Sequence, residues 1–222
     1  MTMESAAGRN AAVWRTLYER GAGDLRYPSE VLVRLAARLL PAGEPLDVLD
    51  FGCGTGANLA HIASRGHRVR GVDVAPHAVA RARERLHAAG LPGEAAVIEP
   101  GAPLPFESRS FDAVVAWQVL CYNDRAGWAH CVREFERVLR PGGLVLAATA
   151  APGDVSQLEA QPLGDALYRS RVPGQEECLL LIPERAQLAG LFPGRALQVG
   201  EFAYEFGALR ARHWILSYRT AS

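Results

Sequence analysis

The apolar residues of this chain gather in short runs that alternate with longer amphipathic segments. Five runs of four to seven residues have the length of β-strands, at residues 46–51, 69–72, 95–98, 111–117 and 144–148. None of them alternates strictly between apolar and polar positions. Such runs are typical of strands in a sheet that is covered on both faces, as parallel sheets are.

The segments between these runs carry apolar residues at the spacing of amphipathic helices. They cover residues 57–65, 76–89 and 124–139. Two more helices are expected ahead of the first strand, over residues 10–21 and 27–40. The repeated strand–helix order predicts an α/β fold, in which a mostly parallel sheet has helices on both faces.

The C-terminal part departs from this order. Residues 196–206 and 211–219 both read as strands, and their short connection near Gly207 predicts an antiparallel pair. The parity of the apolar positions changes across Gly200, which predicts a β-bulge there. The complete expectation is a seven-stranded, mostly parallel sheet with an antiparallel last strand.

A long segment without a clear strand separates Thr149 from Cys178. Structureless loops of that length are unusual in compact domains, so we expect a lid-like insertion with a short helix of its own. The chain is interpreted as a single domain over residues 1–222. Its parts are an N-terminal helical cap (1–44), a cofactor-binding core (45–150), the insertion (151–182) and a C-terminal helix with the strand pair (183–222).

Charge and hydropathy exclude several classes of function. The chain has 24 basic side chains, all of them arginine, and 24 acidic ones, so its formal net charge is zero. It therefore lacks the basic footprint of most nucleic-acid-binding proteins, and we expect no nucleic-acid partner. No window approaches the roughly 18 apolar residues of a membrane span, and residues 1–10 lack the apolar centre of a signal peptide, so no membrane association is expected.

The four cysteines indicate a reducing compartment. Cys53, Cys121, Cys131 and Cys178 show neither C-x-x-C pairing nor the spacing of metal fingers. This pattern predicts free thiols, a cytoplasmic location and no metal site. None of these features determines the oligomeric state.

The most informative short stretch is "DVLDFGCGTGANL" at residues 47–59. Its Gly52-x-Gly54-x-x-Ala57 pattern satisfies the dinucleotide-binding fingerprint, which makes a nicotinamide-dependent oxidoreductase one candidate. Asp73, at the end of the second predicted strand, agrees with that function because a carboxylate can accept hydrogen bonds from both hydroxyls of a ribose. The two features indicate a ribose-bearing cofactor and leave its identity open.

Four motifs in sequence order narrow the choice. "VLDFGCGTGANL", "VRGVDVAP", "LPFESRSFDAVVAWQVLCY" and "EFERVLRPGGLVLAA" resemble those of class I S-adenosylmethionine-dependent methyltransferases, over residues 46–150. The flanks "RYPSEVLVRL" and "RHWILSY" are similar to those of a bacterial branch of small methyltransferases. The resemblance implies a Rossmann-like fold, S-adenosylmethionine as cofactor, S-adenosylhomocysteine as product and methyl transfer to a small-molecule acceptor. Within the last motif, "RPGG" is interpreted as a structural turn.

The resemblance also implies which residues surround the cofactor. The glycine loop would hold the methionine half, with Asp50 as counter-charge to its ammonium group, and Asp73 would bind the ribose. Gly56 and Ala57 are explained as well by close packing between helix and strand. The full set expected at the cofactor is Tyr18, Arg26, Tyr27, Asp50, Gly52, Cys53, Gly54, Asn58, Asp73, Val74, Glu99, Gly101 and Trp117.

Two members of that set have competing interpretations. Family members have an acid shortly before "LPF" that accepts from the adenine amine; counting back five residues from Leu104 gives Glu99, whereas the commoner "GD" form puts Pro100 there. We favour Glu99, assisted by the backbone near Gly101. Trp117 suits a cofactor contact and the last core position of a strand equally well.

The acceptor side is predicted from topology. If the last strand is antiparallel, its start lies at the same edge as the glycine loop, which makes His213 the candidate base or substrate ligand. The alternative for His213 is a polar residue bonded to a backbone carbonyl. The remaining substrate candidates, which suggest a small polar or anionic acceptor, are Tyr122, Asn123, Tyr168, Arg169 and Arg171.

Methyl transfer requires no catalytic triad, because the cofactor supplies the reactive group and the protein mainly orients the acceptor. Two other functions stay open. A nicotinamide-dependent oxidoreductase would share the glycines and Asp73, and a non-catalytic protein could retain the fold and the cofactor site. An RNA methyltransferase is less compatible with a neutral chain.

Overall fold

The computed structural model describes residues 6–207 and 209–221. Within these residues, seven strands form one sheet in the order β3-β2-β1-β4-β5-β10-β9, and three short strands form a second sheet in the order β6-β7-β8. The parallel core consists of β1 (Asp47–Phe51), α3 (Ala57–Ser64), β2 (Arg68–Asp73), α4 (Pro76–Ala88), β3 (Glu94–Val97), β4 (Phe111–Trp117), the 3₁₀ helix η1 (Leu120–Tyr122), α5 (Arg125–Val138) and β5 (Leu139–Ala150).

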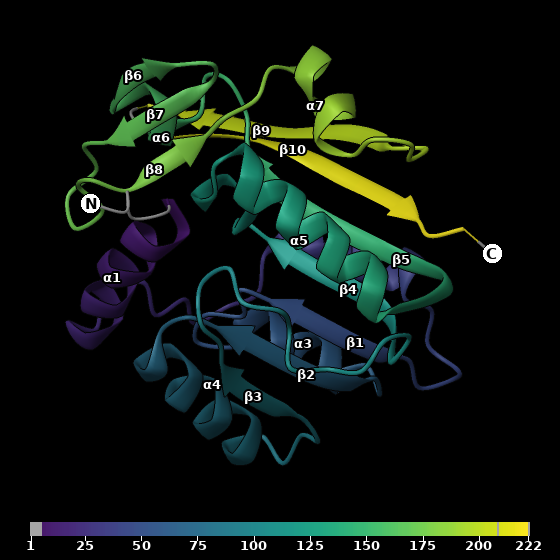
Figure 1. Ribbon diagram of the computed structural model, residues 1–222. Helices are drawn as coiled ribbons and strands as arrows, with labels where there is room; N and C mark the ends of the chain where they lie inside the picture. Colours follow the sequence, from purple (N-terminus) through teal and green to yellow (C-terminus); the bar gives the residue numbers. More distant parts are fainter. Residues whose placement is uncertain (1–5, 208, 222) are drawn as a thin grey trace.

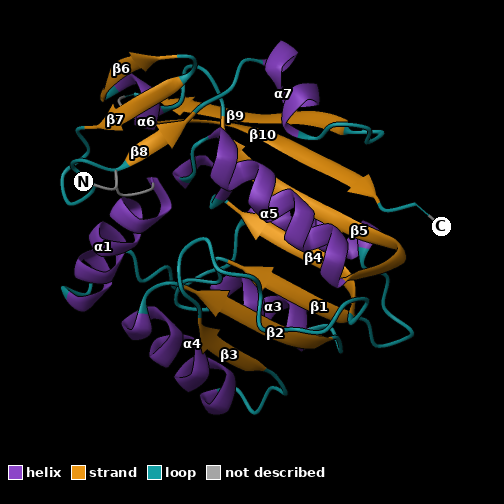
Figure 2. Cartoon of the chain, in the orientation of Figure 1, coloured by secondary structure: helices purple, strands orange, loops and turns teal. Residues whose placement is uncertain are grey.

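The remaining elements lie at the two ends of the chain. Two helices precede the core, α1 (Ala6–Glu19) and α2 (Glu30–Leu39). After β5 come α6 (Val155–Leu158), β6 (Ala160–Gly164), β7 (Leu167–Ser170), β8 (Leu179–Leu181), α7 (Arg185–Leu191), β9 (Gln198–Phe206) and β10 (Leu209–Arg219). Figures 1 and 2 show α1 and the small sheet on the side toward which the parallel strands point.

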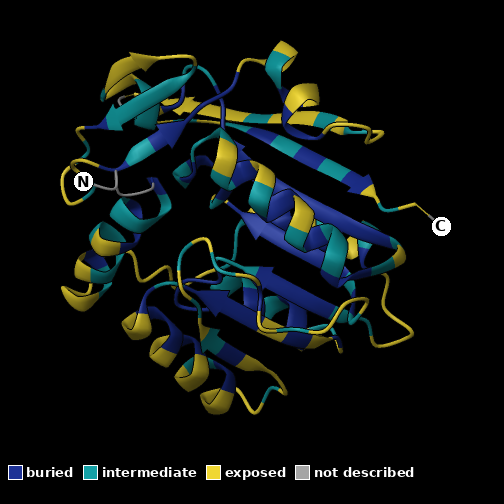
Figure 3. Ribbon diagram, in the orientation of Figure 1, coloured by how far each residue is buried: buried dark blue, intermediate teal, exposed yellow. Residues whose placement is uncertain are grey.

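Helices cover both faces of the main sheet, which explains the uninterrupted apolar runs of its central strands. On one face, α5 and α7 bury Phe135 and Phe192 together with Trp214 of β10. On the other face, α2, α3 and α4 pack over side chains that include Val48 and Val115. Figure 3 shows the resulting buried central strands between helices whose outer faces are exposed. No helix of the described residues is long and apolar enough to cross a membrane.

The strand directions confirm the predicted fold class. β1 pairs in parallel with β2 on one side and with β4 on the other, β4 pairs in parallel with β5, and β10 is antiparallel to β5. Because the chain order reverses at β1, the crevice next to the carboxyl end of β1 is the place where such sheets bind ligands.

The expectation that the insertion contains no clear strand is wrong. Residues 160–181 form the three-stranded sheet, in which β6 and β7 make an antiparallel hairpin and β8 pairs with β7. The hairpin turns at Asp165 and Ala166, which adopt φ angles of 48° and 60°. Positive φ at both central residues is the conformation of tight two-residue hairpin turns. β6 and β7 are short and largely half-buried or exposed, and β6 contains a proline and a glycine, so their pattern is weak in the sequence.

The predicted bulge at Gly200 is also wrong. β9 pairs with β10 without interruption from Gln198 to Phe206. The change of apolar parity instead places Leu197 and Val199 against the α7 side of the sheet, whereas Phe202 and Tyr204 lie on the opposite face, with ring centroids 6.0 Å apart. β9 is an edge strand whose second face is not buried, so its apolar residues need not share one side.

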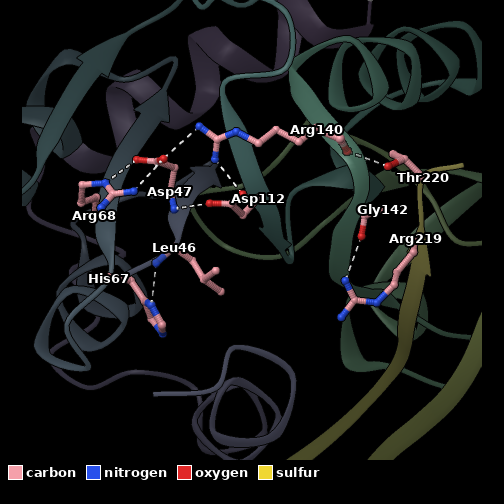
Figure 4. A network of polar contacts seen from close by, with 9 residues as sticks. All are labelled: Leu46, Asp47, His67, Arg68, Asp112, Arg140, Gly142, Arg219 and Thr220. Atoms are coloured by element: carbon pink, nitrogen blue, oxygen red, sulfur yellow. Dashed lines mark hydrogen bonds and ion pairs between the residues drawn. The ribbon is translucent and has the colours of Figure 1, made fainter. Parts of the chain in front are cut away.

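The "RPGG" motif lies inside β5 and not in a turn ahead of it. The β4–β5 pairing shifts register between Phe111 and Ala113, which accommodates residues 140–143. Figure 4 shows how Arg140 connects the amino ends of three strands: it pairs with Asp47 of β1 at 3.1 Å and with Asp112 of β4 at 2.7 Å, while Arg68 of β2 also pairs with Asp47. This network lies at the edge of the sheet away from the glycine loop, so it contributes to folding only.

The Asp47 network predicts a contribution to acid stability. The hydrogen bonds from Arg68 and then from Arg140 lower the pKa of Asp47 to about 2. A carboxyl with a lowered pKa stabilises the fold fully above its ordinary pKa and loses this effect as the pH falls through the folded-state value. Between about pH 5 and pH 2, the wild type should therefore lose roughly 1–2 kcal/mol of unfolding free energy relative to Asp47→Asn. Urea denaturation across this range measures the difference; parallel stability curves for the two proteins would contradict it.

Candidate functional site

A cavity of about 760 Å³ opens at the carboxyl ends of the parallel strands. The strand ends contribute Phe51 from β1, Asp73 from β2, Ile98 after β3 and Trp117 from β4. Its volume is within the range of about 300–1,000 Å³ that is usual for small-molecule sites. The cavity therefore occupies the crevice that the sheet topology predicts.

The glycine loop forms one wall of this cavity, and two of its glycines could not carry a side chain. Gly52 and Gly54 have φ angles of 74° and 51°. A Cβ at Gly52 would lie 2.5 Å from Val119, and a Cβ at Gly54 would lie 2.8 Å from the Tyr18 hydroxyl. Gly56 has a packing role, since a Cβ there would lie 2.9 Å from the backbone of Ala82 in α4. The loop is thus confined between the segment after β4, α1 and α4.

Asp73 ties this loop to the end of β2. Its two carboxylate oxygens each accept one backbone N–H at 2.9 Å, from Gly54 and from Ala75. Burial raises the pKa of Asp73, and the backbone hydrogen bonds act against that rise. A carboxylate has about four acceptor positions, so these backbone hydrogen bonds leave acceptor capacity for a ligand in the cavity.

Asp50 lies beneath the loop and does not line the cavity. The residue is 1% exposed, and its Oδ2 has no hydrogen-bond partner among the described residues. Burial, and then the charge of Asp73, raise the pKa of Asp50 to about 7. A buried carboxyl without a partner is costly when ionised, which makes this position favourable for a nearby cation.

Helix α1 closes the cavity from the N-terminal side, and sequence reasoning missed most of its contacts. The Asn10 side chain donates to the carbonyls of Tyr122 and Leu179 and accepts from the Leu179 amide, at 2.7–2.8 Å. Arg15 donates to the Val74 carbonyl at 2.9 Å and lies 3.5 Å from the Glu99 carboxylate. These contacts join α1 to the ends of β2 and β3 and to the small sheet. Their partners are 59 to 169 residues away in the sequence, so no local sequence pattern predicts these contacts.

The wall after β3 contains both positions considered for the acid that binds adenine, Glu99 and Pro100. Glu99, Pro100 and Gly101 all line the cavity. His130 of α5 also lines it and contacts the Ala102 carbonyl through Nε2 at 3.2 Å. A carbonyl can only accept, so this nitrogen is the protonated one in that contact.

Thirteen predicted site residues line the cavity. They are Tyr18, Tyr27, Gly52, Cys53, Gly54, Asn58, Asp73, Val74, Glu99, Gly101, Trp117, Tyr122 and Asn123. Burial raises the pKa of the Cys53 thiol well above its ordinary value, which argues against a role as nucleophile. The described residues contain no cluster of His, Cys, Asp and Glu that could hold a metal ion.

Five other predicted residues, besides Asp50, lie outside the lining. Arg26 is exposed, and its guanidinium group lies over the neighbouring Tyr27 ring. The Arg85 side chain of α4 donates to the backbone carbonyls of Leu25 and Arg26. In the small sheet, the Tyr168 hydroxyl accepts from Gln157, Arg169 faces Glu177 at 3.5 Å, and the Arg171 amide binds the Glu159 carbonyl. The fifth residue is His213. The insertion was expected to cover the cavity, but the recorded side-chain contacts of Tyr168 and Arg169 are with other residues of the insertion, and Arg171 is exposed.

His213 lies behind a cavity residue. Its Nε2 is 3.1 Å from the side-chain amide nitrogen of Gln118 and 3.4 Å from the carboxylate of Asp154, which is 4% exposed. Burial lowers the pKa of His213, and the charge of Asp154 opposes this effect. Gln118 lines the cavity with an unusual φ of 56°. His213 therefore fixes the orientation of Gln118 and does not itself reach the cavity.

Comparisons with known proteins agree with the sequence motifs. Residues 48–143 match a family model described as a methyltransferase domain. The chain is 33% identical over 147 residues to the malonyl-[acyl-carrier protein] O-methyltransferase of Erwinia pyrifoliae, covering 64% of this chain and 53% of that protein. It is 38% identical over 107 residues to the ubiquinone biosynthesis O-methyltransferase of Methylocella silvestris, covering 48% and 40%. The chain thus spans about half the length of these curated relatives.

Solved structures share the fold. The 1,6-didemethyltoxoflavin-N1-methyltransferase of Burkholderia thailandensis, with bound 1,6-didemethyltoxoflavin and S-adenosylhomocysteine, superposes with a TM-score of 0.70 at 21% identity, covering 100% of this chain and 93% of that one. A methyltransferase of Methanosarcina mazei described as SAM-dependent gives a TM-score of 0.70 at 21% identity, covering 88% and 99%.

The buried carboxyl of Asp50, whose Oδ2 has no hydrogen-bond partner among the described residues, leads to a stability prediction for the ligand-free protein. An acid with a raised folded-state pKa favours the fold below its unfolded pKa, and this effect is lost as the pH rises through about 7. The predicted quantity is the unfolding free energy of Asp50→Asn minus that of the wild type. This difference should be roughly 1–3 kcal/mol larger at about pH 8 than at about pH 4. Chemical denaturation at both pH values measures this difference. A pH-independent difference would mean that ionised Asp50 has a partner.

Proposed function

The chain contains a class I S-adenosylmethionine-dependent methyltransferase domain, and we propose that it transfers a methyl group from this cofactor to a small-molecule acceptor. The observation that carries the proposal is the pairing of two buried carboxyls at the glycine loop. Asp73 has acceptor positions left for a ligand, and the Oδ2 of Asp50 has no hydrogen-bond partner among the described residues. A ligand that carries both a ribose and an ammonium group fits this pair.

The residues around the cavity fit S-adenosylmethionine part by part. The loop from Gly52 to Gly54 would hold the methionine portion, with Asp50 as the buried counter-charge. Asp73 would accept from the ribose hydroxyls, and Glu99 with the backbone of Gly101 would meet the adenine. When bound, the cofactor supplies an activated methyl group and leaves as S-adenosylhomocysteine.

The protein's own task is to orient the acceptor and to exclude water. Proximity of the reacting groups can account for much of the rate of such a displacement. His213 does not line the cavity, so we assign it the positioning of Gln118 and not the removal of a proton. Trp117 and Val119 form apolar wall beside the loop, which limits the water near the reacting methyl group.

The nicotinamide alternative is disfavoured by charge. A dinucleotide would bring a pyrophosphate to the glycine loop, where the carboxyls of Asp50 and Asp73 lie. No arginine among the described residues lines the cavity to neutralise the pyrophosphate, and the chain has no lysine. A ligand without phosphate avoids this repulsion. The four buried thiols suit a reducing compartment, and we propose the cytoplasm.

Asp73→Asn tests the cofactor assignment. Asparagine keeps one acceptor oxygen but loses the charge, and charge-assisted hydrogen bonds contribute about 1.5–3 kcal/mol, so S-adenosylhomocysteine should bind the variant tenfold or more weakly. Isothermal titration calorimetry measures the affinity, and thermal denaturation checks that the variant is folded. The matched control is Asp165→Asn, which removes an exposed carboxylate paired with Arg125 and should leave the affinity unchanged.

Two results would reject the proposed function. One is NADH binding to the wild type while S-adenosylhomocysteine produces no heat. The other is unaltered S-adenosylhomocysteine affinity in a folded Asp73→Asn variant. If the cofactor binds but no member of a broad acceptor panel is methylated, the domain is a binding protein without turnover.

A further inference from the structure

The cavity has two chemically different halves. The first is formed by the carboxyl ends of the strands and the glycine loop, and it fits the cofactor. The second is formed by elements outside the parallel core: α1, the segment after β4, and residues 173–175. Tyr18 of α1 belongs to the residues expected at the cofactor, but the other side chains of this half have no role in the cofactor assignment. We therefore use them to infer the chemical class of the acceptor.

Three aromatic rings dominate the second half. The Trp14 ring meets Tyr122 edge-on, with centroids 4.9 Å apart and an interplanar angle of 86°. It lies beside Tyr18 at 5.6 Å with an angle of 33°. All three rings line the cavity. Aromatic rings arranged in this way present faces and edges to a flat ring, which they bind better than a saturated molecule.

The second half also lacks positive charge. The ionisable side chains of the lining with acidic character, Asp73, Glu99 and Glu134, lie on the cofactor half, and no arginine of the described residues reaches the lining. Arg15 of α1 donates to the Val74 carbonyl and pairs with Glu99. A buried anion without a cation is strongly disfavoured. An anionic acceptor, which Arg169 and Arg171 suggested in the sequence, therefore has no counter-charge here.

The polar groups that remain are neutral amides. Gln118 is held by His213 at 3.1 Å and by a backbone hydrogen bond from its amide to the Ala148 carbonyl, so its position is determined from outside the cavity. Gln175 accepts a hydrogen bond from the Tyr122 hydroxyl at 3.3 Å. Such amides orient hydroxyl groups or ring nitrogens without adding charge.

We propose that the methyl acceptor is an uncharged, planar aromatic molecule with a hydroxyl group or a ring nitrogen as nucleophile, bound against the wall that Trp14 and Tyr122 form together. This inference rests on the proposed function and specifies its substrate class. The acceptor's lone pair forms the new bond to the methyl carbon while the methyl–sulfur bond breaks, and the bonding electrons stay on sulfur. A hydroxyl acceptor releases its proton to water.

The test uses three probes on the full chain saturated with S-adenosylhomocysteine. 2-Naphthol is neutral and planar, 2-naphthoate has the same rings with a negative charge, and decahydro-2-naphthol has the hydroxyl without aromaticity. Calorimetric titration should give 2-naphthol an affinity at least tenfold above those of the other two. Equal or tighter binding of 2-naphthoate, or equal binding of the saturated alcohol, would overturn the proposal.

Variants locate the probe. Trp14→Leu should weaken 2-naphthol binding tenfold or more, whereas Trp14→Phe, which keeps a ring, should restore most of it. The control Tyr204→Leu removes an exposed aromatic residue of β9 that does not line the cavity, and it should change nothing. Unchanged 2-naphthol affinity in folded Trp14→Leu would contradict the proposed position. If Trp14→Leu does not fold, the ranking of the three probes on the wild type decides.

These outcomes separate the two proposals. Loss of the aromatic preference with intact S-adenosylhomocysteine binding rejects the substrate class and leaves the methyltransferase assignment standing. Absence of S-adenosylhomocysteine binding in the wild type rejects both.

Discussion

The hydrogen bonds between the end of β2 and the glycine loop are the interaction on which the site depends. The Val72 carbonyl accepts from the amides of Gly52 and Cys53, at 2.8 and 3.0 Å, and Asp73 accepts from Gly54. These bonds bend the chain sharply after β1, which is possible only because the glycines adopt positive φ. The same bend brings the loop under the Tyr18 hydroxyl and against Val119, so α1 and the segment after β4 have to pack on a shape that β2 defines.

The parts of the fold that could be predicted are those with strong local periodicity. The five strands of the parallel core and the helices between them form one continuous pattern, and the sheet order and direction confirm it. The β6–β7 hairpin was missed because its residues are half exposed and its turn uses Asp165 and Ala166, where a glycine would have been a clearer signal. The wrong bulge at Gly200 came from assuming that both faces of an edge strand are constrained alike.

The site residues likewise divide into those that a local sequence pattern predicts and those that it does not. Residues within the motifs, such as Asp73 and Gly54, were predictable because the loop geometry demands those residue types. Asn10, Trp14 and His130 were not, since their importance arises from contacts with segments distant in the sequence. Arg169 and His213 were placed at the correct edge of the sheet, but sequence alone does not reveal that their side chains point away from the cavity.

Asn10 has a consequence for how this domain can change. Its single amide group holds η1 and β8 together through three hydrogen bonds, and it lies on the helix whose Arg15 contacts the ends of β2 and β3. A substitution in the small sheet that shifts β8 would therefore move α1 and, with it, the part of the cavity wall that α1 forms. Mutational divergence toward a new acceptor is constrained to pass through compensating changes in α1, and the two segments should be exchanged between related proteins as a pair.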